Sequence, residues 1–462
     1  MQAEEIGYLD PVQAFAPWAA RPWSMFLDSA RADGAMGKHS FICVQPCRRV
    51  TVTGGQLLLD GQPVEGDPFS CLETLLRTHP APPLAGLPPF QGGAAGYIGY
   101  EMGRYLEQID APGTDDMGLP DMAMGIYDQI LAFDLQARRT WILTRDSGAK
   151  DADERLTRLR QNLARARATP LPPFPQEIDV QEWRANFSRE EYENAAARVV
   201  KYILAGDIFQ ANIARRFAVS LGSGFDRFEF YRRLRKVNPA PFSAFLEMGD
   251  YAIASASPER FLRLGDGLIE ARPIKGTRPR GQTPEEDAAL AAELCASEKD
   301  RAENVMIVDL LRNDLSRVCA DHSVDAPSLC ALESYASVHH LVSEVTGRLC
   351  PGLGAVDALR AAFPGGSITG APKIRAMQII AEQEPHRRGP YCGAIGYIGF
   401  DGAMDMNIAI RTITMNATQA VFHAGGGIVA DSDPHAEYRE SLDKARALFA
   451  AFGLNPPEEA AP

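Results

Sequence analysis

The sequence predicts an α+β fold, because strand-like and helix-like segments gather in blocks instead of alternating one by one. Segments typical of strands dominate before residue 145 and return after Gly393, whereas residues 284 to 312 are typical of helices. No repeat with a period of about 20 to 50 residues is visible, which argues against a solenoid or a propeller. A proline-rich stretch divides the chain into two regions.

Alternating or short apolar runs define the strands. Val50 to Leu59 is predicted to form a hairpin, since Gly54 and Gly55 interrupt it. The stretch from Phe90 to Tyr100 carries small residues on one face, where another backbone can pass closely. Gly393 to Phe400 has a similar sequence, which we interpret as a similar strand without an internal duplication. The other strands predicted in the N-terminal half are Trp23–Leu27, Phe41–Val44, Gly125–Phe133 and Thr140–Thr144.

Helix signals flank the proline-rich stretch. Ala152 to Ala168 is predicted to be a charged helix, and Ser188 opens another helix with a capping box. The stretch Thr169–Gln176 contains four prolines and is predicted to connect an N-terminal region, residues 1–170, with a catalytic region, residues 177–455. Further predicted elements are the strands Ile208–Ser220 and Ser243–Ser255 and the helices Pro284–Leu294, Lys299–Arg312 and His435–Phe452.

The composition is that of a globular protein. Of the 462 residues, 45% are hydrophobic and 23% are charged, with a net charge of -13. This charge argues against nucleic acid as a partner, since phosphate backbones require clustered Lys and Arg. The acidic start lacks the basic and apolar regions of a signal peptide, and no apolar run is long enough to span a bilayer. We therefore expect a cytoplasmic protein without a membrane partner, whose eight cysteines are reduced.

Lys275 is the first candidate for chemistry. Pro273 restricts the preceding backbone and Gly276 permits a positive φ, so the lysine is presented at a constrained bend. A crowded or buried amine loses its proton more easily, and Arg272 and Arg278 would act in the same direction if they lie near it. The alternative is a solvated basic turn that ends a strand.

Two pairs of acidic residues are candidates for binding a cation. Asp300 and Glu303 are three residues apart in a predicted helix, and Glu437 and Glu440 repeat this spacing in the last helix. Mg²⁺ prefers oxygen ligands and is usually held by one or two carboxylates together with water and substrate oxygens. The alternative is that each pair belongs to an ordinary solvated helix face.

Other features favour an anionic ligand. The glycine-rich loop Gly365–Lys373 leads into a helix and is not a Walker A loop, because no Ser or Thr follows its lysine. The stretch from His423 to Val429 is a second place where backbone N–H groups can approach a carboxylate. Arg411 can supply a bidentate fork to such a group. His340 lies in an apolar run, where a lone histidine is more often a core residue.

Four segments of the chain resemble the chorismate-utilising enzymes. The resemblance implies two large antiparallel β-sheets in a sandwich, as in anthranilate synthase component I, with helices packed outside and both regions interlocked in one body. It also implies the branch that converts chorismate and ammonia to 4-amino-4-deoxychorismate for p-aminobenzoate and folate biosynthesis. The segments are Pro273–Arg280, Lys299–Leu315, Phe363–Lys373 and Ala424–Ser432.

The resemblance assigns catalytic roles to two residues. It implies that Lys275 attacks C2 of chorismate while Glu259, as the general acid/base, protonates the departing C4 hydroxyl. Gln210 stands where the isochorismate and salicylate branches have a lysine that activates water, so it cannot be that base. The remaining residues that the resemblance implies in substrate binding are Gly276, Thr277, His340, Tyr391, Arg411, Gly425, Gly426, Gly427 and Lys444.

The resemblance also implies a metal ion and a partner subunit, and it leaves two alternative functions open. Mg²⁺ would be ligated by Glu303 and Glu440, with Glu437 and Asp300 acting through bound water. A separate glutamine amidotransferase subunit would supply ammonia. The alternatives are anthranilate synthase component I, which usually has Ala in place of Lys275, and a non-catalytic binding protein of the same fold. Relatives also bind tryptophan, for which the candidate pocket residues are Leu27, Ser29, Pro241, Phe242 and Ser243.

Overall fold

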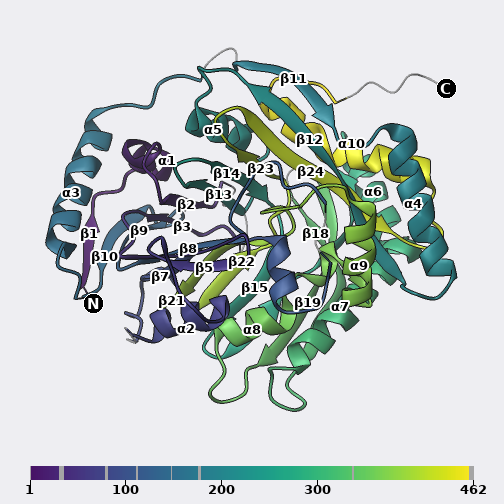
Figure 1. Ribbon diagram of the computed structural model, residues 1–462, viewed down its shortest axis with the longest axis horizontal. Helices are drawn as coiled ribbons and strands as arrows, with labels where there is room; N and C mark the ends of the chain where they lie inside the picture. The colour runs from purple at the N-terminus through teal and green to yellow at the C-terminus, as the bar shows by residue number, and fades with distance from the viewer. Residues whose placement is uncertain are drawn as a thin grey trace.

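Two large sheets, each of 12 strands among the described residues, form the centre of the molecule. The computed structural model describes residues 2–30, 36–78, 82–110, 113–146, 148–174, 178–335 and 338–456. Residues 175 and 176 of the predicted connection, and the predicted boundary at residue 177, lie outside these ranges. The strands run through the interior and the helices lie around them (Figure 1), which confirms the predicted α+β class.

The first sheet carries the glycine-rich strand of the candidate site. Every strand pair in it is antiparallel, and it takes strands from both sides of the proline-rich stretch. Its order is β1 (Gln2–Ile6), β10 (Arg139–Thr144), β9 (Gln129–Asp134), β3 (His39–Cys43), β2 (Ser24–Asp28), β13 (Phe242–Glu247), β14 (Ala252–Ser257), β23 (Thr412–Met415), β24 (Gln419–Ile428), β12 (Gln210–Leu221) and β11 (Val180–Ala185), with β20 (Gly370–Ala371) paired to β12.

The second sheet carries Lys275 on its edge strand. It is also antiparallel and again combines strands from both regions of the chain. Its order is β17 (Ile274–Pro279), β19 (Val338–Arg348), β16 (Leu268–Ala271), β15 (Arg260–Gly265), β22 (Met404–Asn407), β21 (Ala394–Gly399), β7 (Gly93–Ile98), β8 (Met122–Tyr127), β4 (Arg48–Thr53), β5 (Gln56–Leu59) and β6 (Gln62–Pro63), with β18 (Asp325–Ser334) paired to β19.

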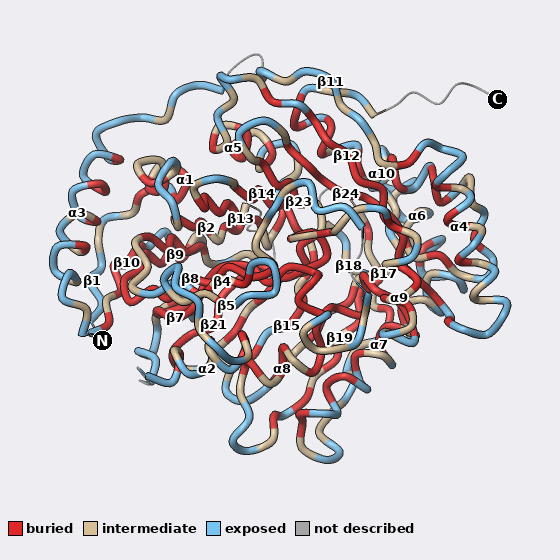
Figure 2. The backbone as a smooth tube through the Cα atoms, viewed as in Figure 1, coloured by how far each residue is buried: buried red, intermediate tan, exposed pale blue. Residues whose placement is uncertain are grey.

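Apolar side chains hold the two sheets together as a sandwich. Phe41 of the first sheet packs on Tyr397 of the second, with ring centroids 5.5 Å apart. Phe90 stacks on the same tyrosine at 4.4 Å, and all three rings are buried. The buried parts of the backbone follow the strands through the centre of the molecule (Figure 2). Within the described ranges, no helix is long and apolar enough to cross a membrane.

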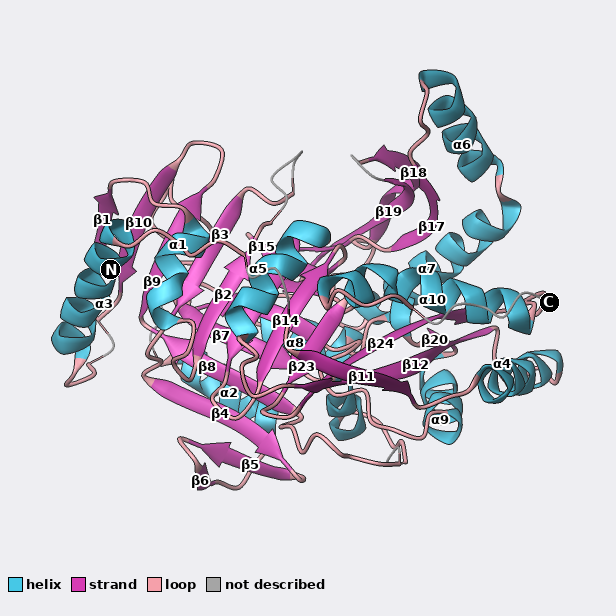
Figure 3. Ribbon diagram, turned by 90° about the horizontal axis from the view of Figure 1, so that it is seen from above, coloured by secondary structure: helices cyan, strands magenta, loops and turns pink. Residues whose placement is uncertain are grey.

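The helices cover the outer faces and one end of the sandwich. Figure 3 shows α3 beside β1 at one edge, while α6 projects at the opposite end next to β17 and β18. The bounds are α1 (Pro11–Phe15), η1 (Ala16–Trp18), α2 (Pro68–Arg77), η2 (Tyr100–Tyr105), α3 (Ala152–Ala168), α4 (Arg189–Leu204), α5 (Arg227–Val237), α6 (Pro284–Ala296), α7 (Glu298–Ser316), α8 (Ala355–Ala362), η3 (Gly366–Ile368), α9 (Lys373–Gln383) and α10 (Pro434–Ala451).

The two similar glycine-rich stretches are partners in one sheet. β7 and β21 pair antiparallel, with Gly96 opposite Gly396. A Cβ added at Gly96 would lie 2.1 Å from the carbonyl oxygen of Ala123, so the predicted close approach of another backbone is confirmed. The capping box at Ser188 and the hairpin of β4 and β5 are confirmed as well.

Two predicted strands are each divided into two strands in the structure. The predicted strand Gly125–Phe133 is divided at Asp128 into β8 and β9, which belong to different sheets. The reason is that both carboxylate oxygens of Asp128 accept hydrogen bonds from Arg155 on α3, at 2.6 and 2.8 Å, in a buried ion pair that takes the residue out of either ladder. The predicted strand Ser243–Ser255 is the hairpin of β13 and β14.

Candidate active site

Lys275 lies on β17 beside a bulge. Lys275 pairs with Leu341 and Thr277 pairs with His340, while Gly276 between them has a φ of 76° and shifts the register. A side chain at position 276 would approach within 2.9 Å of Asp300 on α7. The predicted bend is therefore a glycine bulge inside a strand, and it fixes the direction of the lysine side chain.

Ser367 joins Lys275 to Glu259. The Nζ of Lys275 donates a hydrogen bond to the backbone carbonyl of Ser367 at 3.3 Å. The hydroxyl of Ser367 in turn donates to Oε1 of Glu259 at 2.8 Å. Glu259, immediately before β15, is 6% exposed. A single residue of the glycine-rich loop thus contacts both predicted catalytic side chains.

Burial favours the neutral form of both side chains. It lowers the pKa of Lys275, against the attraction of Glu303. Burial also raises the pKa of Glu259, against the hydrogen bond from Ser367 and the charge of Lys275. A neutral amine can act as a nucleophile and a protonated carboxyl can act as an acid, so these directions fit the predicted roles.

Glu440 on α10 lies within electrostatic reach of two other predicted metal-binding carboxylates, Glu303 on α7 and Glu437 on α10. Burial raises the pKa of Glu303 and of Glu437, and repulsion from Glu440 acts in the same direction. The Glu437 carboxylate accepts a hydrogen bond from Ser432 at 2.6 Å. Glu440 is paired with Lys444 at 2.6 Å, and this attraction lowers its pKa. The fourth residue, Asp300, instead pairs with Arg278 at 3.3 Å.

The donor set suits a hard cation, because it consists of carboxylate oxygens that repel one another when they lack a positive partner. Within the part of the chain that the structure describes, no three His, Cys, Asp or Glu side chains converge on one point. A magnesium ion here would therefore rest on one or two of these carboxylates, with water or substrate oxygens completing its shell.

The glycine strand β24 passes close to the carboxylates of α10. A Cβ added at Gly426 would lie 3.2 Å from Oε1 of Glu440 and 3.5 Å from Nζ of Lys444. Lys444 also donates to the carbonyl oxygen of Gly425 at 3.0 Å, and Arg411 donates to the backbone carbonyl of Lys444 at 2.8 Å. A side chain at position 426 would therefore crowd Glu440 and Lys444, so glycine allows the strand to lie against both groups.

Gln210 is buried at the start of β12, against the same glycine strand. Its Nε2 lies 2.1 Å from the point that a Cβ of Gly427 would occupy. Neither its amide nitrogen nor its amide oxygen has a hydrogen-bond partner among the described residues. Buried polar atoms are normally paired, so this amide is a candidate for contact with a ligand.

The remaining predicted residues form the sides of the site. The hydroxyl of Thr277 and Nδ1 of His340 are 2.8 Å apart, so the structure brings these two predicted residues together. The neighbour His339 is the core histidine, bonded to Ser334 and Asp287. Tyr391 is buried and lies within electrostatic reach of Arg411.

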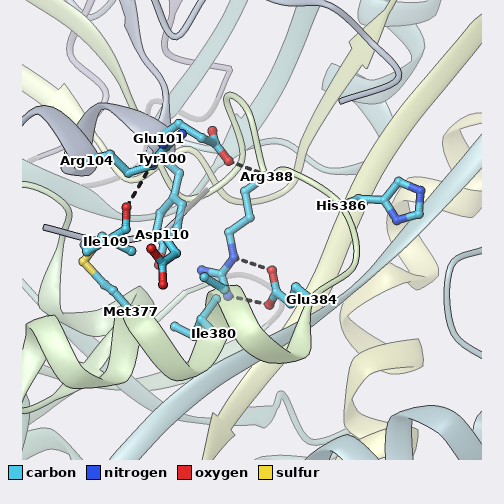
Figure 4. Close-up of a pocket in the computed structure, with 11 residues that line it drawn as sticks. Tyr100, Glu101, Arg104, Ile109, Asp110, Met377, Ile380, Glu384, His386 and Arg388 are labelled. Carbon is cyan, nitrogen blue, oxygen red and sulfur yellow. Dashed lines mark hydrogen bonds and ion pairs between the residues drawn. The ribbon is translucent and has the colours of Figure 1, made fainter. Parts of the chain in front are cut away.

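Sequence reasoning missed the buried network that supports the loop of Ser367. Arg388 donates to both carboxylate oxygens of Glu384, to the carbonyl of Ile368 at 3.1 Å and to the carbonyl of Asn212 at 2.6 Å. Figure 4 shows the guanidinium of Arg388 directed at Glu384, with His386 set apart from both. The arginine thereby ties the loop of Ser367 to β12, and no local spacing signals such a contact.

The five residues predicted for a tryptophan pocket line one cavity. Its volume is about 380 Å³, and it lies where β2 and β13 of the first sheet meet strands of the second. Arg260, Glu270 and Arg272 supply charged groups to its wall. The cavity is large enough for an amino acid with an aromatic side chain.

The chain is similar to known proteins over nearly its whole length. The family described as chorismate binding enzyme matches residues 24–450, which include the complete site. Aminodeoxychorismate synthase component 1 of Klebsiella aerogenes is 45% identical, covering 94% of this chain and 95% of that protein. Anthranilate synthase component 1 of Pseudomonas aeruginosa is 39% identical, covering 96% and 93%. The crystal structure of anthranilate synthase component I from Streptococcus pneumoniae matches with a TM-score of 0.80 and 34% identity, covering 96% of this chain and 99% of that chain.

Proposed function

The chain belongs to the chorismate binding enzymes, and we propose that it is the component of aminodeoxychorismate synthase that aminates chorismate. The observation that carries this proposal is the contact of Ser367 with both Lys275 and Glu259, which places a buried amine and a buried carboxyl on either side of one residue. The similarity to three aminodeoxychorismate synthase components at 42–45% identity supports the same branch.

The first step uses both neutral groups. The Nζ of Lys275 attacks C2 of chorismate, the two ring double bonds shift, and the bond between C4 and its hydroxyl breaks. The hydroxyl leaves as water with the proton of Glu259, and the amine passes a proton to the resulting Glu259 carboxylate as its new bond to C2 forms. Burial supports this step, since it favours an unprotonated lysine and a protonated carboxyl at the same pH.

The second step forms the product and restores the enzyme. Ammonia attacks C4, the ring double bonds shift back, and the bond between C2 and Lys275 breaks as the lysine regains a proton. The enolpyruvyl group stays on the ring throughout. Arg411, Lys444 and the backbone of Gly425 to Gly427 hold the substrate carboxylates; the contacts of Arg411 with Lys444 and of Lys444 with Gly425, which place these groups together, support this role.

Magnesium fits the carboxylates of α7 and α10. Glu303 and Glu440 would hold the ion, with Glu437 and Asp300 acting through bound water. When bound, it supplies an anchor for a substrate carboxylate and stabilises negative charge. The protein groups around it orient the substrate ring, and His340 lies at the edge of this site through its contact with Thr277.

The second candidate function is that of an anthranilate synthase component. It is favoured by relatives of that name at 39–40% identity over 96% of the chain. Lys275 argues against it, because the resemblance places Ala at this position in the anthranilate branch. A non-catalytic role is disfavoured by the intact arrangement of Lys275, Ser367 and Glu259.

Product analysis separates these functions. The protein is mixed with chorismate, Mg²⁺ and ammonium salt, and the products are identified by mass spectrometry. We expect a product in which an amine replaces the hydroxyl and the enolpyruvyl group is retained. Anthranilate together with pyruvate would instead assign the second function, and unchanged chorismate, even with a glutaminase partner added, would support a binding protein.

We further propose that ammonia comes from a glutamine amidotransferase subunit. The reaction would take place in the cytoplasm and would contribute to folate biosynthesis. The name component 1 of the relatives supports a second component. Glutamine should therefore not replace ammonium when this chain acts alone.

The cavity of about 380 Å³ is our proposed tryptophan site. Equilibrium dialysis with labelled tryptophan tests this proposal, and the variant Phe242→Ala is expected to lose binding.

A further inference from the structure

A second, smaller cavity lies behind Tyr391, under the loop of residues 113–121. Its volume is about 30 Å³, which is enough for one or two molecules of the size of water. The loop closes its outer side, and Tyr391 and the strands β23 and β24 form its inner side. The lining residues that matter here are Thr114, Met117, Arg216, Arg387, Tyr391 and His423.

Ion pairs hold the loop in place over this cavity. Asp116 pairs with Arg216 at 2.6 Å, and Asp115 pairs with Arg387 at 3.3 Å. The backbone N–H of Thr114 donates to the carbonyl of Pro385 at 2.8 Å. Asp115 and Asp116 are themselves exposed. The cavity therefore begins at the protein surface and ends at a wall of the active site.

Two buried polar atoms that line the cavity lack hydrogen-bond partners among the described residues. One is Nε2 of His423, a residue that is 6% exposed, and the other is Nε of Arg387. The arginine atom is a donor. Burial together with the charges of Arg216 and Arg388 lowers the pKa of His423 well below its usual value, and a neutral imidazole has one acceptor nitrogen. A ligand that satisfies both atoms must donate one hydrogen bond and accept another.

An ammonium ion does not suit the two unpaired atoms. Arg216 and Arg387 are each paired with an aspartate, and Arg388 pairs with Glu384 at 2.7 Å. Glu101, another carboxyl of the lining, accepts hydrogen bonds from the backbone N–H groups of Arg388 and Gly389. An ammonium ion can donate but cannot accept. Neutral ammonia and water can do both.

The position of Tyr391 links the cavity to the reaction. Its ring stacks on the ring of His423, with centroids 4.9 Å apart and an interplanar angle of 13°. The other side of Tyr391 lies within electrostatic reach of Arg411, which belongs to the candidate site. The tyrosine ring is therefore the partition between the cavity and the substrate space.

We propose that this cavity is a holding site for one molecule of neutral ammonia, which His423 and Arg387 bind before it passes Tyr391 to the substrate. The inference rests on the proposed function, because that function requires ammonia as the second substrate. It adds a binding site and a direction of entry, from the loop of residues 113–121 toward β24. It also gives the enzyme a way to select the nucleophilic form, since a protonated amine cannot attack C4.

Steady-state kinetics with ammonium chloride as the nitrogen source test the proposal. His423→Phe keeps an aromatic ring against Tyr391 but removes the acceptor atom. We expect the KM for ammonium to rise about tenfold, as the loss of one buried hydrogen bond predicts. The KM for chorismate and the kcat at saturating ammonium should stay near the wild-type values. His423→Asn, which keeps an acceptor, is the matched control and should show a smaller rise.

The outcomes are distinct. An unchanged KM for ammonium in the folded His423→Phe protein would mean that the cavity holds water only, and would overturn the inference while leaving the proposed function intact. If the wild-type protein makes no aminated product from ammonium, with or without its partner, both the proposed function and this inference would be wrong. If His423→Phe does not fold, Arg387→Lys takes its place. That variant keeps the positive charge beside Asp115 but removes Nε, the proposed donor, and an unchanged KM for ammonium would again overturn the inference.

Discussion

Two partly buried lysines in this protein lie near a carboxylate, and only one of them contacts it directly. Lys373 at the start of α9 pairs directly with Asp314 on α7 at 2.6 Å and also donates to the carbonyl of Ala362 at 2.7 Å. Lys275 on β17 is separated from Glu259 by Ser367 and donates to a single carbonyl at 3.3 Å. The two regions use the same chemical groups in different geometry.

The difference indicates how the same protein can use one lysine for stability and another lysine for a reaction. Burial lowers the pKa of both amines and raises the pKa of both carboxyls. At Lys373 the main opposing influence is the carboxylate bonded to it. At Lys275 it is Glu303, with which the described residues show no direct ion pair. Without a direct partner, the amine of Lys275 remains available to a substrate.

Removal of Lys275 should have the largest effect on activity. Lys275→Ala deletes the nucleophile, so we expect formation of the aminated product to fall by about 10³-fold or more. The free energy of unfolding should change little, because the side chain makes one long hydrogen bond to the rest of the protein. Mass spectrometry measures the product and urea unfolding measures the stability. Full aminodeoxychorismate formation by the variant would refute the covalent step.

Removal of Lys373 should have the opposite pattern. Lys373→Met leaves Asp314 as an uncompensated buried charge, which costs about 3–5 kcal/mol of the free energy of unfolding. The double variant Lys373→Met with Asp314→Leu removes that charge and should recover most of the stability. Urea unfolding of the three proteins checks both expectations. A single variant as stable as the wild type would mean that the direct pair is not what distinguishes this region.

A third buried carboxyl, Glu101 on η2, has no lysine beside it and sharpens the comparison. It accepts hydrogen bonds from the backbone N–H groups of Arg388 and Gly389 at 2.8 and 2.9 Å, and burial raises its pKa to about 7. Because the folded protein binds this proton more tightly than the unfolded chain, stability should fall as the pH rises from about 4.5 to 7.

The contribution of Glu101 to this pH dependence is on the order of 3 kcal/mol. Glu101→Gln cannot lose a proton, so the stability difference between variant and wild type should change with pH in this range and stay constant above it. Urea unfolding at pH 5, 6, 7 and 8 measures that difference. A difference that is constant over all four values would show that Glu101 is already ionised at the lowest pH.

Local sequence patterns correctly predicted the elements that depend mainly on neighbouring residues. The helix Ala152–Ala168 and the capping box at Ser188 depend on neighbouring residues, and both are confirmed. The division of β8 from β9 depends on Arg155, which is 27 residues beyond Asp128, and it was missed. Strand breaks of this kind cannot be predicted without knowing which distant side chain pairs with the residue at the break.

The same distinction applies to the site. The motifs identified Lys275 and Glu259 as individual residues, because each lies in a segment with a characteristic sequence. They did not identify Ser367 as the contact between them, since Ser367 is 108 residues from Glu259 along the chain. The glycine-rich loop was interpreted as an anion site, yet its residues Gly370 and Ala371 pair with β12.

Ser367 is the residue that separates Lys275 from Glu259, and its substitution should have the smallest effect of those considered. Ser367→Ala keeps the backbone carbonyl that binds Lys275 and removes only the hydroxyl that donates to Glu259. The carboxylate form of Glu259 loses a donor, so its pKa should rise further above its usual value. We expect kcat to fall about tenfold, as loss of one charge-assisted hydrogen bond predicts, with the KM for chorismate nearly unchanged.

Infrared titration of the Glu259 carboxyl, with Glu259→Gln as the blank, measures the pKa change. If the pKa of Glu259 stays the same in Ser367→Ala, the hydroxyl does not control the acid, and the contrast with the direct pair of Lys373 and Asp314 must arise from burial alone.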